Sequence, residues 1–215
     1  MRLRMLIMIT VASLLVAAGW AAHGAHSGDV ASKPLILEKN EGEHRVRRPR
    51  GTPIASLPFI IKVDRTNGGS QRMWLGTEEI KPGVQIPRHQ HLGQDEILIL
   101  ETGTAHVWLG DQERDVHAGG IVYIPSETWI SLKNTGNEPI LLAFVFSAPG
   151  FDDYLRCSST AEGQRSTPIT AEEVAACAEK GHVHYASLSQ TPTVSETFDS
   201  VQAGAASICR DARDS

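Results

Sequence analysis

Hydrophobic and polar positions alternate in short runs between about residues 58 and 146, and turn-forming residues separate the runs. Alternation with a period of two predicts β-strands that bury one face. The predicted strands are 58–64, 72–80, the run around residues 89–91, 96–100, 105–109, 121–124, 129–132 and 140–146. Turns such as Asn67-Gly68-Gly69 and Asn134-Thr135-Gly136-Asn137 lie between them. Short strands at this spacing are typical of an all-β sandwich or barrel.

The pattern changes at Phe151. Residues 151–156 are compatible with a short helix after Pro149-Gly150. Thr170-Ala171-Glu172-Glu173 is a capping box, which predicts a helix at about 171–180 that ends at Gly181. From Ser187 onward the chain is rich in small polar residues, which favours a disordered tail.

The N-terminus has the pattern of a secretory signal peptide. Arg2 and Arg4 precede an uncharged, mostly apolar run, Met5–Ala22, and small residues follow it near Gly24. An uncleaved membrane anchor is the alternative, because the run is close to the minimum length that spans a bilayer. We therefore expect an exported protein, periplasmic or extracellular, that has no membrane attachment after cleavage. The predicted organisation is a signal peptide (1–24), an extended N-terminal arm (25–55), a β-barrel (56–156) and a C-terminal extension (157–215).

Charge argues against one class of partner. The 215-residue chain has a formal net charge of −5, and clustered Lys and Arg are confined to residues 45–50. A nucleic-acid-binding protein would need a larger basic surface. We therefore predict no nucleic-acid partner and interpret the basic cluster as a solvated linker.

The strongest chemical signal is formed by His89, His91 and Glu96. Because successive side chains of a strand alternate, both imidazoles point to the same face. A turn at Leu92–Asp95 then leads to a strand that starts with Glu96. Two imidazoles and one carboxylate can bind a divalent first-row metal and leave coordination positions open. The absence of a thiolate disfavours a soft metal and leaves iron, manganese, nickel, cobalt and zinc as alternatives.

These residues resemble the first motif of the cupin superfamily. The motif is a glycine, His-x-His, a glutamate and a second glycine, and it reads here as Gly83, His89, His91, Glu96 and Gly103 with every spacing kept. The resemblance covers roughly residues 58–156. It is strongest to single-domain cupins similar to quercetin 2,3-dioxygenase, and it implies a double-stranded β-helix with the metal inside the barrel. It also implies a homodimer as a possible assembly.

The second cupin motif is only partly kept. Gly119, Pro125 and Asn134 fit it, whereas Glu127 replaces its inner glycine and Ile130 replaces its histidine. In the family this histidine is usually the fourth metal ligand, and the Ile130 side chain has no donor atom. A three-ligand site and a weakened or lost metal site both remain open.

Three functions are alternatives. The first is a metal-dependent dioxygenase-like oxidoreductase that acts on a small organic substrate, with Glu96 as a ligand or as a base. Its substrate pocket is predicted to include Leu98, Leu100, Trp129 and Ile130. The second is a non-catalytic small-molecule-binding protein, and the third is a metal-dependent isomerase or lyase.

Two further sets of residues lie beyond the predicted barrel. Among Cys157, Cys177 and Cys209 we favour a Cys157–Cys177 disulfide, because it would tie the capped helix to the end of the β domain. His182 and His184 form a second His-x-His. They are interpreted as exposed tail residues, with the alternative that this segment covers the barrel mouth and supplies the missing ligand.

Overall fold

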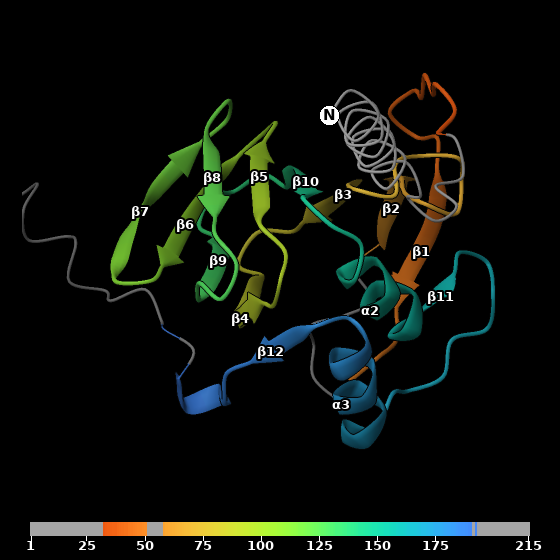
Figure 1. Ribbon diagram of the computed structural model, residues 1–215. Helices are drawn as coiled ribbons and strands as arrows, with labels where there is room; N and C mark the ends of the chain where they lie inside the picture. Colours follow the sequence, from red (N-terminus) through yellow and green to blue (C-terminus); the bar gives the residue numbers. More distant parts are fainter. Residues whose placement is uncertain (1–31, 51–57, 191, 193–215) are drawn as a thin grey trace, which may run out of the picture. The chain divides into compact units, whose positions relative to one another are not determined.

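The computed structural model describes residues 32–50, 58–190 and 192, and those from Lys33 onward belong to one unit of the chain. Most of the described chain lies in two antiparallel sheets, which confirms the all-β prediction (Figure 1). The predicted signal peptide lies outside the described residues. Within those residues, no helix has the length and apolar character needed to cross a membrane.

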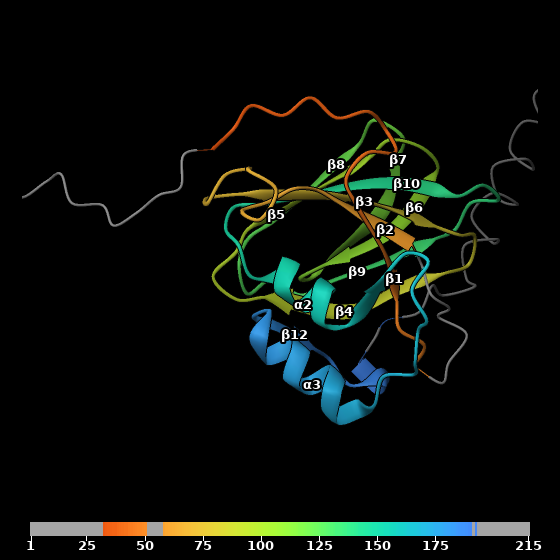
Figure 2. The ribbon, with the colours of Figure 1, turned by 90° about the vertical axis from the view of Figure 1, so that its right-hand side faces the viewer.

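The larger sheet has seven strands in the order β11-β1-β2-β3-β10-β5-β8, and the smaller one has five in the order β12-β4-β9-β6-β7 (Figure 2). The strands are β1 (Glu43–Arg47), β2 (Pro58–Val63), β3 (Trp74–Ile80), β4 (Gln85–His91), β5 (Glu96–Leu100), β6 (Thr104–Leu109), β7 (Gln112–His117), β8 (Ile121–Ile124), β9 (Ile130–Asn134), β10 (Ile140–Phe146), β11 (Ser159–Ala161) and β12 (Val183–Tyr185). The helices are α2 (Phe151–Cys157), α3 (Ala171–Lys180) and the short 3-10 helix η1 (Leu188–Gln190).

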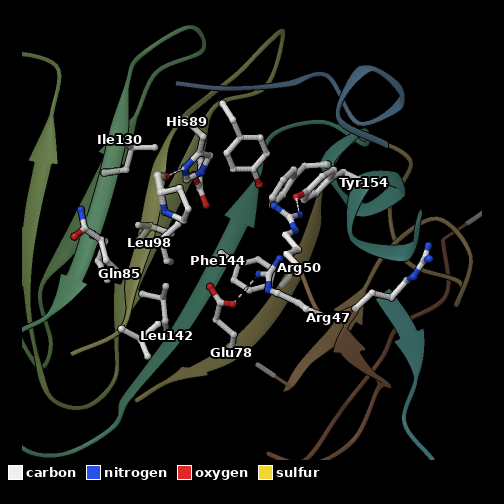
Figure 3. Close-up of a pocket in the computed structure, with 18 residues that line it drawn as sticks. Arg47, Arg50, Glu78, Gln85, His89, Leu98, Ile130, Leu142, Phe144 and Tyr154 are labelled. Carbon is white, nitrogen blue, oxygen red and sulfur yellow. Dashed lines mark hydrogen bonds and ion pairs between the residues drawn. The ribbon is translucent and has the colours of Figure 1, made fainter. Parts of the chain in front are cut away.

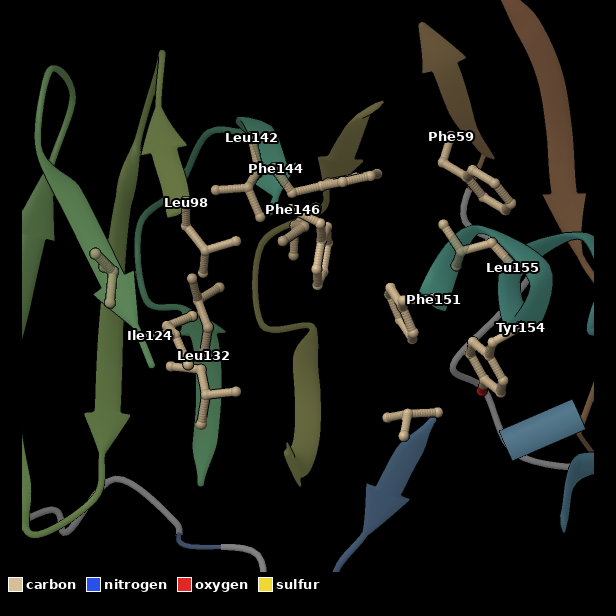
Figure 4. Close-up of a cluster of buried hydrophobic side chains, with 14 of the residues drawn as sticks. Phe59, Leu98, Ile124, Leu132, Leu142, Phe144, Phe146, Phe151, Tyr154 and Leu155 are labelled. Atoms are coloured by element: carbon tan, nitrogen blue, oxygen red, sulfur yellow. The ribbon is translucent and has the colours of Figure 1, made fainter. Parts of the chain in front are cut away.

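The core lies between the inner faces of the two sheets and continues onto α2 (Figure 4). On β10, Leu142, Phe144 and Phe146 are buried. Phe146 stacks on Trp74 with ring centroids 4.6 Å apart. Gly76 makes room for Phe144, since a Cβ there would lie 2.4 Å from that ring. Burial therefore alternates along the strands, and the buried side is the apolar side that the sequence predicts.

Part of the expected N-terminal arm is strand β1, which pairs with β2 and β11. Lys62 holds the loop before β1, because its ammonium donates hydrogen bonds of 2.6–2.7 Å to the backbone carbonyls of residues 38, 39 and 41. Arg156 of α2 adds a salt bridge of 2.6 Å to Glu43 and another to Asp64. Contacts with residues more than a hundred positions away thus order a segment that has no period of its own.

The C-terminal extension packs against the barrel. The Cys157–Cys177 disulfide joins α2 to α3, which confirms that prediction. At Gly181, where α3 ends, a Cβ would lie 2.2 Å from the Cβ of Tyr154, so only glycine permits this close approach. The chain then forms β12, which pairs antiparallel with β4 (Figure 2).

Candidate metal site and its cavity

His89, His91 and Glu96 converge between the two sheets. The histidines end β4 of the five-stranded sheet, and Glu96 begins β5 of the seven-stranded sheet. The two strands follow each other in the chain but belong to opposite sheets. They therefore face each other across the barrel and are not paired side by side in one sheet. All three side chains are buried, and one potential ligand atom of each lies within 4.8 Å of the other two.

Hydrogen bonding prepares one nitrogen of His89 for a ligand role. Its Nδ1 lies 2.8 Å from the carbonyl oxygen of Pro87. A carbonyl can only accept, so Nδ1 carries the proton and Nε2 keeps its lone pair. Metal-binding histidines are commonly oriented by such a hydrogen bond to a backbone carbonyl.

His91 is buried without hydrogen bonds. Neither ring nitrogen has a hydrogen-bond partner among the described residues. Its Nε2 lies 3.4 Å from a carboxylate oxygen of Glu96. The Phe146 and Phe151 rings pack against its ring in T-shaped arrangements, at centroid distances of 4.8 and 4.4 Å. Because buried nitrogens without partners are costly, the donor set of this site fits a cation.

Burial sets the charges of the site. Desolvation lowers the pKa of His89 to about 4 and the pKa of His91 to about 3. It raises the pKa of Glu96 to about 7. Both imidazoles are therefore neutral at neutral pH, which is the form that binds a metal.

Ile130 occupies the place of the usual fourth ligand. It pairs with His89 across β4 and β9 and is buried, with 2% of its surface exposed. Glu127, which replaces the inner glycine of the motif, has a φ of +63°. The backbone therefore keeps the left-handed conformation that favours glycine, although the glycine has been replaced.

A cavity of about 100 Å³ adjoins His89 and Glu96 (Figure 3). Of the predicted pocket residues, Leu98 and Ile130 line it. Leu100 does not line it and is buried in the core. Trp129 lies outside the lining and is half-buried, with the Arg88 guanidinium 5.5 Å from its ring centroid.

Apart from His89 and Glu96, the polar part of the cavity wall was not predicted from the sequence. It consists of the side chains Arg47, Arg48, Arg50, Glu78, Gln85, Tyr154 and Tyr185. Residues 47–50 belong to the segment interpreted as a solvated linker, and pairing of β1 with β11 brings them to the barrel. The alternation along β3 could have identified Glu78, because it shares a face with Trp74 and Ile80.

The second His-x-His does not supply a ligand. The segment does lie beside the site, since β12 pairs with β4. However, His182 and His184 are exposed, while Val183 is buried and Tyr185 lines the cavity. The hypothesis of a ligand from these histidines is therefore wrong, and their interpretation as exposed residues is confirmed.

Comparison with known proteins identifies the domain. Residues 76–146 match the family model of the cupin domain. Residues 76–146 therefore form a cupin domain, as the first motif suggested.

Individual relatives are distant. Over 79 residues the chain is 38% identical to mannose-1-phosphate guanylyltransferase 2 of Escherichia coli O157:H7, and the matched region covers 36% of this chain and 16% of that enzyme. Over 135 residues it is 24% identical to gentisate 1,2-dioxygenase of Ralstonia sp, and the matched region covers 62% of this chain and 37% of that enzyme. A solved structure of a predicted oxalate decarboxylase from Thermotoga maritima is 16% identical and has a TM-score of 0.46, with 53% of this chain and 99% of that chain covered. The chain thus spans less than half of either enzyme matched by sequence.

Proposed function

We propose that His89, His91 and Glu96 hold one divalent first-row cation, and that the protein uses it on a small organic substrate. The observation that carries this proposal is the pair of buried ring nitrogens of His91 that have no hydrogen-bond partner among the described residues. A cation would satisfy one of them and neutralise Glu96 in the same place. Iron, manganese, nickel, cobalt and zinc all suit two imidazoles and a carboxylate.

The proposed reaction is a dioxygenase-type oxidation. When bound, the metal would orient substrate and dioxygen and stabilise developing negative charge. Glu96 borders the cavity, so when it is not bound to the cation it is placed to accept a proton from the substrate. Leu98 and Ile130 add apolar surface to the cavity beside it.

Metal analysis of the purified protein tests the first part. We expect about one bound cation per chain and its loss in His91→Leu. His184→Ala is the matched control, because His184 lies on the strand beside β4 but its side chain is exposed. Wild-type protein that neither contains nor takes up any of the five metals would contradict the proposal.

Oxygen consumption with phenolic and keto substrates tests the second part. Uptake that needs the metal supports the oxidoreductase. Metal-dependent turnover without oxygen uptake would instead support an isomerase or lyase. A non-catalytic binding protein is the second candidate, and the observation that favours it is Ile130 in place of the fourth ligand.

Export and assembly are also proposals. The N-terminal pattern of Arg2, Arg4 and the apolar run supports export to the periplasm or the medium. A homodimer is supported by apolar side chains exposed on β8, where Ile121 is 66% exposed and Tyr123 53% exposed. Mass measurement of the secreted protein by light scattering tests the dimer, and N-terminal sequencing tests the cleavage site.

A further inference from the structure

One side of the cavity is cationic and aromatic, in contrast to its apolar walls. Figure 3 shows Arg47, Arg50, Glu78 and Tyr154 on this side, across the cavity from Leu98. A site for a neutral apolar molecule would not need guanidinium groups, because each must be desolvated when a ligand enters. The ligand preference of the cavity therefore depends on which of these charges is free to meet a ligand.

Two of the three arginines are already neutralised. Arg47 donates a hydrogen bond of 2.8 Å to the buried carboxylate of Glu78. Arg48 forms a salt bridge of 3.1 Å with Glu173 of α3 and also donates to the carbonyls of residues 167 and 168. Neither guanidinium therefore offers an uncompensated charge to the cavity.

Arg50 differs from both. Its guanidinium donates one hydrogen bond to the hydroxyl of Tyr154, and its central carbon lies 5.9 Å from the ring centroids of Tyr154 and Tyr185. Among the described residues it has no carboxylate partner, and the segment that follows it, 51–57, contains no Asp or Glu. The two rings flank the guanidinium, and among the described residues its other N–H donors have no hydrogen-bond acceptor. Free donors in this fork geometry can bind a planar anion in a bidentate way.

The size of the cavity limits what can enter. An apolar cavity of about 150 Å³ holds one benzene molecule. The present cavity, at about 100 Å³, is of the same order. It therefore suits a compact molecule with a few carbon atoms or a single ring.

From these observations we propose that Arg50 binds the carboxylate of a small organic acid, whose other end reaches His89 and Glu96 past the walls formed by Leu98 and Phe144. The proposal rests on the proposed function only for that second end, where the metal would lie. Recognition by Arg50 does not need the metal. This charge would make the protein select acids over neutral molecules of the same shape.

The test is a calorimetric titration of the full purified chain, with and without bound metal. The probes are benzoate, 4-hydroxybenzoate and pyruvate, each compared with its neutral amide. In the metal-free chain at least one acid should bind about tenfold more tightly than its amide, because a hydrogen bond to a charged group contributes roughly tenfold or more in affinity. Arg50→Gln should remove this preference and leave amide binding unchanged, and Arg50→Lys should keep part of it.

Arg48→Gln is the matched control. It removes a neighbouring positive charge whose guanidinium is held by Glu173, so the preference for acids should persist. Acids and amides that bind equally, no acid that binds at about 10 mM, or a preference that survives in Arg50→Gln would each overturn the inference. Inorganic phosphate that binds more tightly than every acid would also overturn it.

The two proposals can fail separately. If no metal binds but the preference for acids depends on Arg50, the metal proposal fails and the acid site stands. If metal binds and Arg50→Gln leaves acid binding unchanged, the acid site fails and the metal proposal stands. Arg50→Lys retains the charge, so it also decides the case if Arg50→Gln does not fold.

Discussion

Replacing His91 with leucine should make the metal-free protein more stable while it removes stabilisation by metal. His91 is 2% exposed, and both of its ring nitrogens lack hydrogen-bond partners among the described residues. Its pKa of about 3 means that the ring is neutral at neutral pH, so the substitution removes no charge. The aromatic rings around it, Phe146 and Phe151, suit an apolar side chain of similar size.

The expected gain comes from the cost of those nitrogens. A buried polar atom without a partner costs about 1–3 kcal/mol. An imperfect fit of leucine, whose shape differs from imidazole, costs up to about 1.5 kcal/mol. Because His91 has two such nitrogens, the gain of about 2–6 kcal/mol exceeds this cost, so the free energy of unfolding of the metal-free variant should be at least about 0.5 kcal/mol higher than that of the wild type.

Metal should reduce or reverse this difference in stability between variant and wild type. A cation at a hundred times its dissociation constant stabilises the wild type by about 2.7 kcal/mol. The variant lacks a ligand and should gain little. The assay is urea denaturation monitored by fluorescence, first in the presence of a chelator and then with each of the five candidate metals.

His106→Leu is the control for a general effect of replacing histidine. His106 Nδ1 lies 2.7 Å from a carboxylate oxygen of Asp115 on the neighbouring strand. Loss of this hydrogen bond in His106→Leu should destabilise the protein by about 0.5–1.5 kcal/mol with or without metal. If metal-free His91→Leu proved less stable than the wild type, the nitrogens would have to be satisfied in solution, and the main argument for a cation would fail.

Three further predictions concern other parts of the molecule. Replacing Cys157 and Cys177 with serine should lower the free energy of unfolding by about 3 kcal/mol, measured by denaturation against the oxidised wild type, and no change would mean that the disulfide constrains little. Glu127→Gly should raise the melting temperature, since a φ of +63° costs a non-glycine residue about 1 kcal/mol, and a lower melting temperature would show that the Glu127 side chain contributes more than this strain costs. Metal affinity should fall as the pH drops through about 7, because Glu96 must lose its proton to become a ligand and burial raises its pKa to that value; titrations at several pH values that show constant affinity would contradict Glu96 as a ligand.

The barrel and the convergence of the three site residues could be predicted because both depend on local patterns. The alternation in 96–100 buries Glu96, Leu98 and Leu100 as expected, and His89 and His91 share the inner face of β4. Strand β7 was missed because its six residues are polar and mostly exposed, so they show no alternation of apolar positions.

The cationic side of the cavity could not be predicted, because distant pairings create it. Arg47 and Arg50 reach the barrel through β1, whose partner β11 lies more than a hundred residues further along the chain. Tyr185 reaches it through β12. At His182 a φ of +53° resets the direction of the chain before β12, so the sequence spacing did not show which of the following side chains face inward.

The ligands come from both halves of the sandwich, His89 and His91 from one sheet and Glu96 from the other. A cation between them would therefore act as a cross-link that closes the two layers, as well as a centre for chemistry. Loading and removal of the ion would then change how readily the layers separate, so resistance to proteases would depend on the local supply of metal.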